Sequence, residues 1–284
     1  MLKIHNGVDP QLTAALRELV QSCIAEDKTI PKIYWNIIKE EREIANDLFF
    51  YRDDRLIGYL TGFLFAQREI EISACIHPDY RQKGIFKALY NMVKSRILPF
   101  TPVSYFLFPC PRGNDITKQC ITSWGAKHFR TEYYMGYSPK LRKKTPEQYE
   151  ITLRRATLDD VDLLARIDNV SFSTKFETMQ KRFQEIIPAK NRKAWLAYVD
   201  DRCVGKIHTR FDDDRILIHE FCIMQEARRK GYGAQVLQQT VDILSNAGQK
   251  VGLDVEADNE NAVHLYLANG FEIVQAYDYH RLDN

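Results

Sequence analysis

One short stretch of this chain occurs twice. The second copy, residues 222–233, reads CIMQEARRKGYG, and the first copy, residues 75–86, reads CIHPDYRQKGIF. The copies lie 147 residues apart (228 − 81), and a second matching pair, Asn114 and Asn259, lies 145 residues apart (259 − 114). Each of these Asn residues precedes a Gly-containing segment, 124–126 or 269–271. Two anchors at nearly one offset indicate an internal repeat, which must be recognised before elements are assigned.

The repeat predicts two domains. A chain of 284 residues is long enough for two cores, since single domains cluster at roughly 100–150 residues. Residues 140–147 are charged and include Pro146, as expected of an exposed linker. We therefore predict an N-terminal domain at 1–142 and a C-terminal domain at 143–284.

Hydrophobic periodicity predicts the same order of elements in each half: a strand, a helix, further strands, the Gly-containing turn, a helix, a strand and a short helix. In the second half, strands are expected at 193–199, 202–211, 215–224 and 251–255, and helices at 231–244 and 261–268. Such a pattern packs helices against a mixed sheet. The predicted fold class is α+β, with two tandem domains that are each a mixed, mostly antiparallel sheet flanked by helices.

Composition excludes several classes of protein. A net charge of +2 argues against a nucleic-acid binder with a broad basic face. No apolar run approaches the roughly 20 residues of a membrane span, and residues 1–6 lack the apolar core of a signal peptide. The six cysteines are scattered without metal-ligand spacing. We expect a cytoplasmic protein with reduced thiols, no membrane partner and no metal.

The repeated stretch is typical of an anion site. In the second copy, Arg228-x-x-Gly231-x-Gly233 lies between a strand pattern and an amphipathic helix, so backbone N–H groups gather at a helix N-terminus. Glycines allow a phosphate to approach the backbone, and the three basic residues at 228–230 add positive charge. A Rossmann fingerprint would need a small residue at Val236, and a P-loop would need Gly-Lys-Ser/Thr. Neither motif fits this chain.

The sequence resembles the GNAT superfamily of N-acetyltransferases. Members share the turn (Arg/Gln)-x-x-Gly-x-(Gly/Ala) and a later segment, Asn-x-x-Ala-x-x-x-Tyr-x-x-x-Gly-Phe, which this chain has at 259–271 as NENAVHLYLANGF. The resemblance covers nearly the whole second half and, less faithfully, the first half. It implies two tandem GNAT-like domains and transfer of an acetyl group from the cosubstrate acetyl-CoA.

The resemblance also implies roles for individual residues. The turn amides of 229–234 would hold the pyrophosphate of acetyl-CoA, and strand residues 221–223 would bond the pantetheine through main-chain groups. Tyr266 would protonate the departing CoA thiolate. The implied cofactor-binding set is Phe221, Cys222, Ile223, Arg228, Arg229, Lys230, Gly231, Tyr232, Gly233, Ala234 and Asn259.

Direct acyl transfer also needs a base, because an ammonium substrate must lose a proton before it attacks. Glu220 precedes the cofactor-binding strand segment, and Asp254 lies on the following strand, so either carboxylate is a candidate. His219 and His264 are weaker candidates. Since neighbouring residues of a strand point to opposite faces, we expect that His219 and Glu220 do not both face the site.

The first half departs from the family pattern. Phe86 replaces Gly233, and Ile121, Ser73 and Pro109 stand where the second half has Tyr266, Glu220 and Asp254. We therefore expect the N-terminal domain to be degenerate and catalytically silent, either binding CoA without turnover or serving as a scaffold.

The leading hypothesis is an acetyl-CoA-dependent N-acetyltransferase that acts on a primary amine, small or peptidic, by direct transfer in a ternary complex. Two alternatives stay open: a CoA-binding regulatory protein without turnover, and an O-acyl or longer-chain acyltransferase. The stretch 172–187, in a region where this fold sets its specificity, carries no readable code for the acceptor. Oligomeric state is equally unspecified by the sequence.

Overall fold

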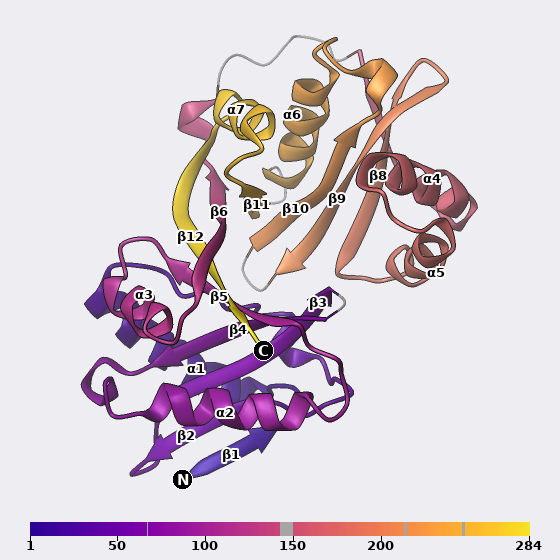
Figure 1. Cartoon of the computed structure of the whole chain (residues 1–284). Coiled ribbons are helices and arrows are strands. Elements are labelled where there is room, and N and C mark those ends of the chain that lie inside the picture. Colours follow the sequence, from indigo (N-terminus) through magenta and orange to yellow (C-terminus); the bar gives the residue numbers. More distant parts are fainter. Residues whose placement is uncertain (67, 143–149, 213–214, 246–247) are drawn as a thin grey trace. The chain divides into compact units, whose positions relative to one another are not determined.

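The computed structural model describes all residues except 67, 143–149, 213–214 and 246–247. The chain forms two compact units (Figure 1). Unit 1 consists of Met1–Tyr133 and Gln275–Asn284, and unit 2 of Tyr134–Val274.

Unit 1 is a mixed sheet with helices against it. Its strands lie in the order β1-β2-β3-β4-β5-β12. All neighbours pair antiparallel except β4 and β5, which are parallel. The elements are β1 (Leu2–His5), α1 (Pro10–Asp27), η1 (Ile37–Lys39), β2 (Asp47–Arg52), β3 (Arg55–Ala66), β4 (Glu69–Ile76), η2 (Pro78–Tyr80), α2 (Ile85–Ile97), β5 (Tyr105–Pro111), α3 (Asp115–Thr122), the start of β6 (Lys127–Tyr137) and most of β12 (Phe271–Asp283).

Unit 2 repeats this arrangement. Its strands lie in the order β6-β11-β10-β9-β8-β7, and β10 and β11 are the parallel pair that corresponds to β4 and β5. The elements are η3 (Pro139–Leu141), β7 (Thr152–Arg155), η4 (Leu158–Asp160), α4 (Val161–Phe172), α5 (Phe176–Ile186), β8 (Arg192–Val199), β9 (Arg202–Asp212), β10 (Arg215–Ile223), η5 (Gln225–Ala227), α6 (Tyr232–Ser245), β11 (Lys250–Glu256) and α7 (Glu260–Ala268).

The two halves of the sequence exchange their last strands. β12, which follows α7, pairs antiparallel with β5 from Tyr277↔Pro111 to Asp283↔Tyr105. β6, which follows α3, is the neighbour of β11. The compact units therefore differ from the stretches 1–142 and 143–284, because each unit includes a strand from the other stretch. The predicted join at 140–147 lies largely outside the described residues, which stop at 142 and resume at 150.

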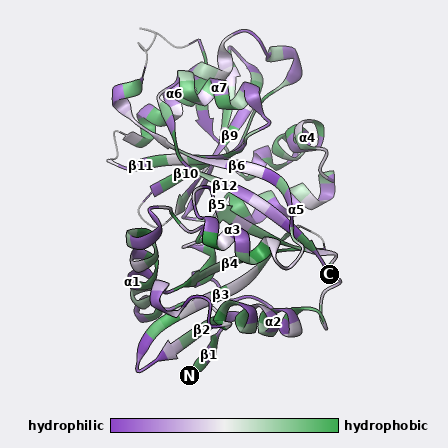
Figure 2. Ribbon diagram, turned by 60° about the vertical axis from the view of Figure 1, so that its left-hand side comes forward, coloured by the Kyte–Doolittle hydropathy of each residue, from purple (hydrophilic) through white to green (hydrophobic). Residues whose placement is uncertain are grey.

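The core of unit 1 consists of two clusters on different sets of helices. One contains Val93 of α2 and Ile121 of α3, and the other contains Leu16 and Cys23 of α1. Both helices α1 and α2 carry polar and apolar residues along the ribbon (Figure 2), and the buried apolar ones belong to these clusters. Helices on both faces of a sheet bury alternate residues of each strand in opposite directions.

The predicted fold class is confirmed, since each unit is a mixed, mostly antiparallel sheet flanked by helices. The strands expected at 193–199, 202–211 and 215–224 correspond to β8, β9 and β10. Residues 172–187 contain α5, whose buried face is Met179, Phe183 and Ile186. These three residues lie at i, i+4 and i+7, the spacing of one helix face, so the sequence contained a signal for α5.

Candidate functional site

The Gly-containing turn of unit 2 has the geometry of an anion site. Arg229 and Gly231 both adopt left-handed backbone conformations, with φ of 61° and 81°, and α6 begins at the next residue, Tyr232. Arg228 Nε donates to the carbonyl oxygen of Ile223 at 2.9 Å, which fixes the turn to the end of β10. The first amides of α6 have no partner inside the helix and are available to a phosphate.

Unit 1 contains the same turn. Gln82 and Gly84 have φ of 58° and 77°, and Arg81 Nε donates to the carbonyl oxygen of Ile76 at 3.1 Å. A Cβ added at Gly84 or at Gly231 would meet no atom within 4 Å. These glycines are therefore required by their positive φ rather than by crowding.

The third glycine position is less demanding. A Cβ at Gly233 would make ordinary contacts of 3.6 Å with Leu265 of α7 and 3.7 Å with Ile223 of β10. Gly233 thus lies where the turn, β10 and α7 meet. In unit 1 the corresponding Phe86 stacks on Trp124, with ring centroids 5.1 Å apart. A large side chain is accommodated there without changing the turn.

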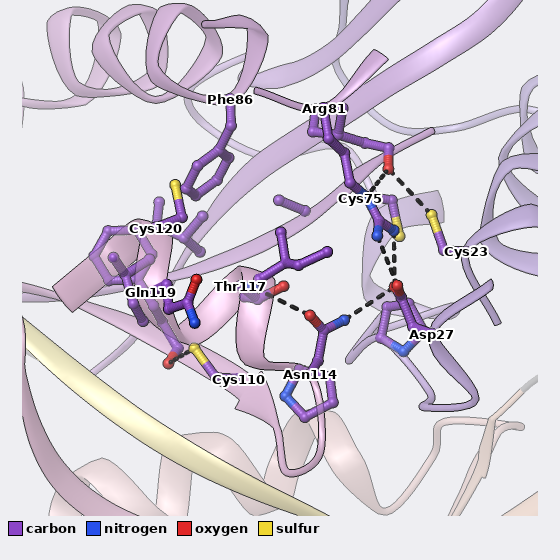
Figure 3. A pocket seen from close by; sticks show the side chains of 18 of the residues that line it. Cys23, Asp27, Cys75, Arg81, Phe86, Cys110, Asn114, Thr117, Gln119 and Cys120 are labelled. Carbon is purple, nitrogen blue, oxygen red and sulfur yellow. Dashed lines mark hydrogen bonds and ion pairs between the residues drawn. The ribbon is translucent and has the colours of Figure 1, made fainter. Parts of the chain in front are cut away.

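The two turns differ in charge. Asp27 accepts two hydrogen bonds from the guanidinium of Arg81, at 2.6 and 2.7 Å, and a third from Asn114 Nδ2 at 2.9 Å (Figure 3). Among the described residues, Arg228 has no carboxylate partner. Unit 2 therefore presents three basic residues at its turn, whereas in unit 1 the charge of Arg81 is neutralised.

A cavity of about 500 Å³ adjoins the turn of unit 1 (Figure 3). Its lining includes Cys23 from the α1 side of the sheet and Phe86 from the α2 side. It passes between β4 and β5, whose pairing ends at Glu71 and Leu107. Separating parallel strands leave backbone groups unpaired, so an extended ligand arm can bond them as an added strand.

One end of this cavity has an acid–base group that the sequence analysis missed. Lys32 lines the cavity, and its ammonium lies 2.8 Å from Glu132 Oε2. Nearby, Glu71 is 3 % exposed and accepts hydrogen bonds from the hydroxyls of Tyr34 and Tyr279. Burial raises the pKa of Glu71 to about 7. The signal available in the sequence was a carboxylate between two apolar strand residues, Ile70 and Ile72.

In unit 2, Glu220 lies in a β-bulge. The pairing of β9 with β10 shifts between His219 and Cys222, and Glu220 has a φ of 49°. Left-handed backbone at a non-glycine residue is strained, and such strain is concentrated at functional sites. The bulge follows His219, one residue after Ile218, the last residue of β10 that pairs with β11.

Glu220 belongs to a group of charged and polar side chains that we call the Glu220 cluster. Arg182 donates to Glu220 Oε1, while His208 Nδ1 lies 2.9 Å and Lys206 Nζ 3.7 Å from Oε2. The cluster consists of Asp168, Arg182, Lys206, His208, His219 and Glu220. It gathers residues from α4, α5, β9 and β10 around one carboxylate.

The expectation that His219 and Glu220 point to opposite faces is wrong. His219 Nδ1 lies 3.7 Å from Glu220 Oε1, because the bulge breaks the alternation of side chains along β10. Burial lowers the pKa of His208 to about 4 and also lowers the pKa of His219, so both rings are neutral at pH 7. Their Nε2 atoms have no hydrogen-bond partner among the described residues.

The carboxylate of Glu220 is held in its ionised form. Burial alone would raise its pKa, but hydrogen bonds from His208 and His219 and the charge of Arg182 outweigh burial and hold the pKa well below its usual range. Ligand atoms of His208, His219 and Glu220 all lie within 4.8 Å of one another. Since Arg182 and Lys206 already contact the same carboxylate, the charges favour ion pairing over binding of a metal cation.

The other candidates occupy separate positions in unit 2. Tyr266 is buried in α7, 5.8 Å from the ring of Phe271, and burial raises its pKa to about 12. Asp254 is an exposed residue of β11, next to Leu253, where the pairing with β10 ends. Asn259 caps α7 by accepting a hydrogen bond from the amide of Ala262 at 3.3 Å.

Comparison with known proteins identifies the family. The model of the acetyltransferase (GNAT) family matches residues 13–98 and 161–271, which is more than half of the chain. The chain therefore belongs to the GNAT acetyltransferase family, whose reaction class is acyl transfer.

Similar proteins agree with this assignment. N-alpha-acetyltransferase 50 of Danio rerio is 28 % identical over 131 residues, which cover 44 % of this chain and 76 % of that protein. A GCN5-related N-acetyltransferase from Sphaerobacter thermophilus matches with a TM-score of 0.80 and 16 % identity, over 99 % of this chain and 95 % of that one. A tandem GNAT protein from the clavulanic acid biosynthesis pathway matches with a TM-score of 0.74 and 13 % identity, over 100 % and 98 %. At such identities the two structures support the fold alone.

Among the helices that the structure describes, none combines the length and the apolar character needed to span a bilayer.

Proposed function

We propose that this protein is an acetyl-CoA-dependent N-acetyltransferase that acts on a primary amine by direct transfer in a ternary complex. The observation that carries the proposal is the bulge of β10, which presents the Glu220 carboxylate two residues beyond the last β10–β11 pair. Unit 2 thereby has a candidate base, Glu220, close to the point where the parallel strands β10 and β11 stop pairing. Acetyl-CoA would supply the acetyl group as a thioester, whose carbonyl carbon is activated for attack by the amine.

Residues of unit 2 fit a CoA ester. The turn at 228–234 offers helix N-terminal amides and three basic side chains to the pyrophosphate. Phe221, Cys222 and Ile223 lie where the pairing of β10 with β11 has ended, while Cys222 and Ile223 still pair with β9. The main-chain groups on the edge away from β9 would bond the pantetheine. The side chain of Asn259 caps α7, and we assign it an indirect role in shaping the site.

The acid–base roles follow from charge state. Tyr266, with its pKa raised to about 12, stays protonated at neutral pH and can give its proton to a leaving thiolate. Glu220 is ionised and can accept the proton of an ammonium once Arg182 releases Oε1. Asp254, more exposed, is the second carboxylate that we propose as a base.

We propose that unit 1 binds CoA without turnover. It has the same turn conformation and a cavity beside it. The positions that correspond to Tyr266 and Glu220 are Ile121, which is fully buried, and Ser73, whose hydroxyl donates to the carbonyl oxygen of Lys32 at 2.7 Å. Neither can serve as an acid or base.

A CoA-release assay across amine classes tests the proposal. Polyamines, aminoglycosides, amino acids and peptide N-termini should be compared, and peptide N-termini deserve priority because one relative is named an N-alpha-acetyltransferase. We expect one class to release CoA with formation of an acetylated amine. If CoA binds but no class is acetylated, the regulatory CoA-binding alternative is correct; products with esters or longer acyl groups would favour an O-acyl or longer-chain acyltransferase.

A further inference from the structure

An ion pair lies buried behind the carboxylate of Glu220. Lys206 of β9 is 0 % exposed and pairs with Asp168 of α4, whose side chain is 2 % exposed. The ammonium of Lys206 is also 3.7 Å from Glu220 Oε2. The rings of Phe172 and Phe183 flank this ammonium, with their centroids 5.6 and 5.0 Å from Lys206 Nζ. Lysine is almost never buried to this degree unless it is paired.

Such a pair is a poor choice for stability. Removing two charges from water costs more free energy than their attraction commonly returns, and apolar replacements of similar volume are often neutral or stabilising. The pair therefore calls for an explanation other than packing.

Unit 1 provides an internal comparison. Lys206 pairs with Cys222 across β9 and β10, and Tyr59 pairs with Cys75 across β3 and β4, so the two positions correspond at the repeat offset of 147. Tyr59 is 0 % exposed and packs against Phe49 in an apolar cluster. The fold thus accepts an uncharged aromatic residue at this position. Lys206 is not required by the architecture.

The contacts of Glu220 differ between its two oxygens. Oε2 faces Lys206 and His208, which are 0 % and 1 % exposed in their side chains, whereas Oε1 faces Arg182, which is 39 % exposed, and His219. The groups around the carboxylate come from α5, β9 and β10, and Asp168 of α4 stands behind Lys206. One oxygen is held by buried partners and the other by a partner that reaches solvent.

We propose that Asp168 and Lys206 are positioning residues that hold Glu220 Oε2 inside unit 2, so that Oε1 accepts the proton of the amine substrate. This inference rests on the proposed function, in which Glu220 is the base. The substrate ammonium displaces Arg182 from Oε1, and one proton passes from nitrogen to Oε1. The neutral amine then attacks the thioester carbonyl carbon, the C–S bond breaks as the C–N bond forms, and the CoA thiolate leaves with a proton from Tyr266, which the proton released by the acylated nitrogen replaces. Asp168 is needed to fix Lys206, because an unpaired buried ammonium would turn toward solvent or lose its charge.

The test replaces the pair by apolar residues of similar size. Asp168→Leu combined with Lys206→Met should fold, since the exchange removes two buried charges together. We expect kcat to fall roughly tenfold to hundredfold, a part of the usual contribution of general-base catalysis, while KM for acetyl-CoA changes little. The acidic limb of the pH profile should move to higher pH, because the cation that is removed lies 3.7 Å from Glu220 Oε2, whereas the anion removed with it, Asp168, stands behind that cation. Asp242→Asn, which breaks the ion pair with Arg142 elsewhere in unit 2, is the matched control and should change neither quantity.

Several outcomes overturn the inference. A folded double variant with wild-type kcat and an unchanged pH profile would show that the pair only fills space. Should the apolar variant fail to fold, Asp168→Asn with Lys206→Gln keeps the volume and hydrogen bonding without charge, and the same two readouts decide. Glu220→Gln separates the two proposals: if it leaves kcat unchanged, the base assignment itself is wrong, whereas an inactive Glu220→Gln with an active pair variant refutes only the role of the pair.

Discussion

The two units share the strand register at the ends of β4 and β10, where Tyr59↔Cys75 corresponds to Lys206↔Cys222, but they place different chemistry there. In unit 1, β3 and β4 form a regular ladder from Gly58↔Ile76 to Phe63↔Glu71, with Tyr59 in an apolar core. In unit 2, β10 bulges after His219, and Lys206 occupies the position of Tyr59. Unit 1 therefore shows that the fold does not require a buried charge at this position. The buried charges of unit 2 mark it as the catalytic candidate.

The turns before α2 and α6, in contrast, have the same backbone conformation and differ in charge. Both have a left-handed residue two positions before a left-handed glycine, and both Arg Nε atoms donate to the end of the preceding strand. Asp27 neutralises Arg81 in unit 1. Shared geometry with unequal charge predicts that both units bind a CoA pyrophosphate, and that unit 2 binds it more tightly.

The largest expected effect comes from blocking one turn at a time. Gly231→Trp places a large side chain at a position with a φ of 81°, so both strain and bulk oppose binding of the pyrophosphate. We expect a loss of roughly a hundredfold or more in kcat/KM, the scale of a misplaced substrate. Gly84→Trp, at a φ of 77° in unit 1, is the matched control and should leave acetyl transfer within about twofold. The reverse result would assign catalysis to unit 1.

The next effect concerns the base of unit 2. Glu220→Gln removes the proton acceptor but keeps its shape, and we expect kcat to fall by roughly a hundredfold, the lower end of the usual contribution of general acid–base catalysis. Asp254→Asn is the comparison, since Asp254 is the other proposed base. Steady-state kinetics with a good acceptor separates them, and a large loss in Asp254→Asn alone would move the base to β11.

Replacing the proposed acid should have a smaller effect. Tyr266→Phe removes only a hydroxyl, and because a thiolate is a good leaving group we expect kcat to fall roughly tenfold to hundredfold. CoA affinity, measured by calorimetry, should stay the same. Since burial raises the pKa of Tyr266 to about 12, the wild-type pH profile should show no alkaline limb from this residue below about pH 10. An unchanged kcat would show that Tyr266 is not the acid that protonates the thiolate.

The smallest expected effect lies in unit 1 and concerns stability. The pKa of Glu71 is raised from 4.5 to about 7 in the folded state, so between these values the folded chain binds more protons than the unfolded chain. Its contribution is present below about pH 4.5 and is lost as pH rises through about 7. Glu71→Gln should therefore gain roughly 1–3 kcal/mol relative to wild type between about pH 5 and pH 8.

Urea unfolding of the wild type and of Glu71→Gln, at about pH 5 and at about pH 8, measures this difference in the free energy of unfolding. The tandem units require a probe of unit 1, and Trp124 fluorescence is suitable once Trp195 of unit 2 is replaced by phenylalanine in both proteins, because Trp124 packs against the core of unit 1. A difference that does not change with pH would mean that Glu71 is already ionised at about pH 5. Acetyl transfer should be unaffected by Glu71→Gln, because Glu71 is outside unit 2.

Sequence alone predicted most of the fold and part of the site. The turn at 228–233, the strands around it and α7 follow from local patterns, because glycine φ, helix capping and strand alternation are short-range effects. Helix α5 was predictable from the sequence as well, because Met179, Phe183 and Ile186 lie at i, i+4 and i+7, the spacing of one helix face. Glu71 has no matching carboxylate in the second half, where Ile218 stands at the repeat offset of 147, so the repeat contains no signal for it.

The sequence by itself determined the duplication, the GNAT family and the two turns, since these depend on residues that are close along the chain. Only the tertiary structure decided which strand completes each unit, that β10 bulges at Glu220, and that Lys206 and Asp168 meet behind it. A register shift and a buried ion pair arise from segments separated by tens of residues, and their free energies depend on burial and partners. The pattern of a single strand contains neither the register shift nor the ion pair. Strict alternation along β10 therefore predicted the wrong orientation for His219.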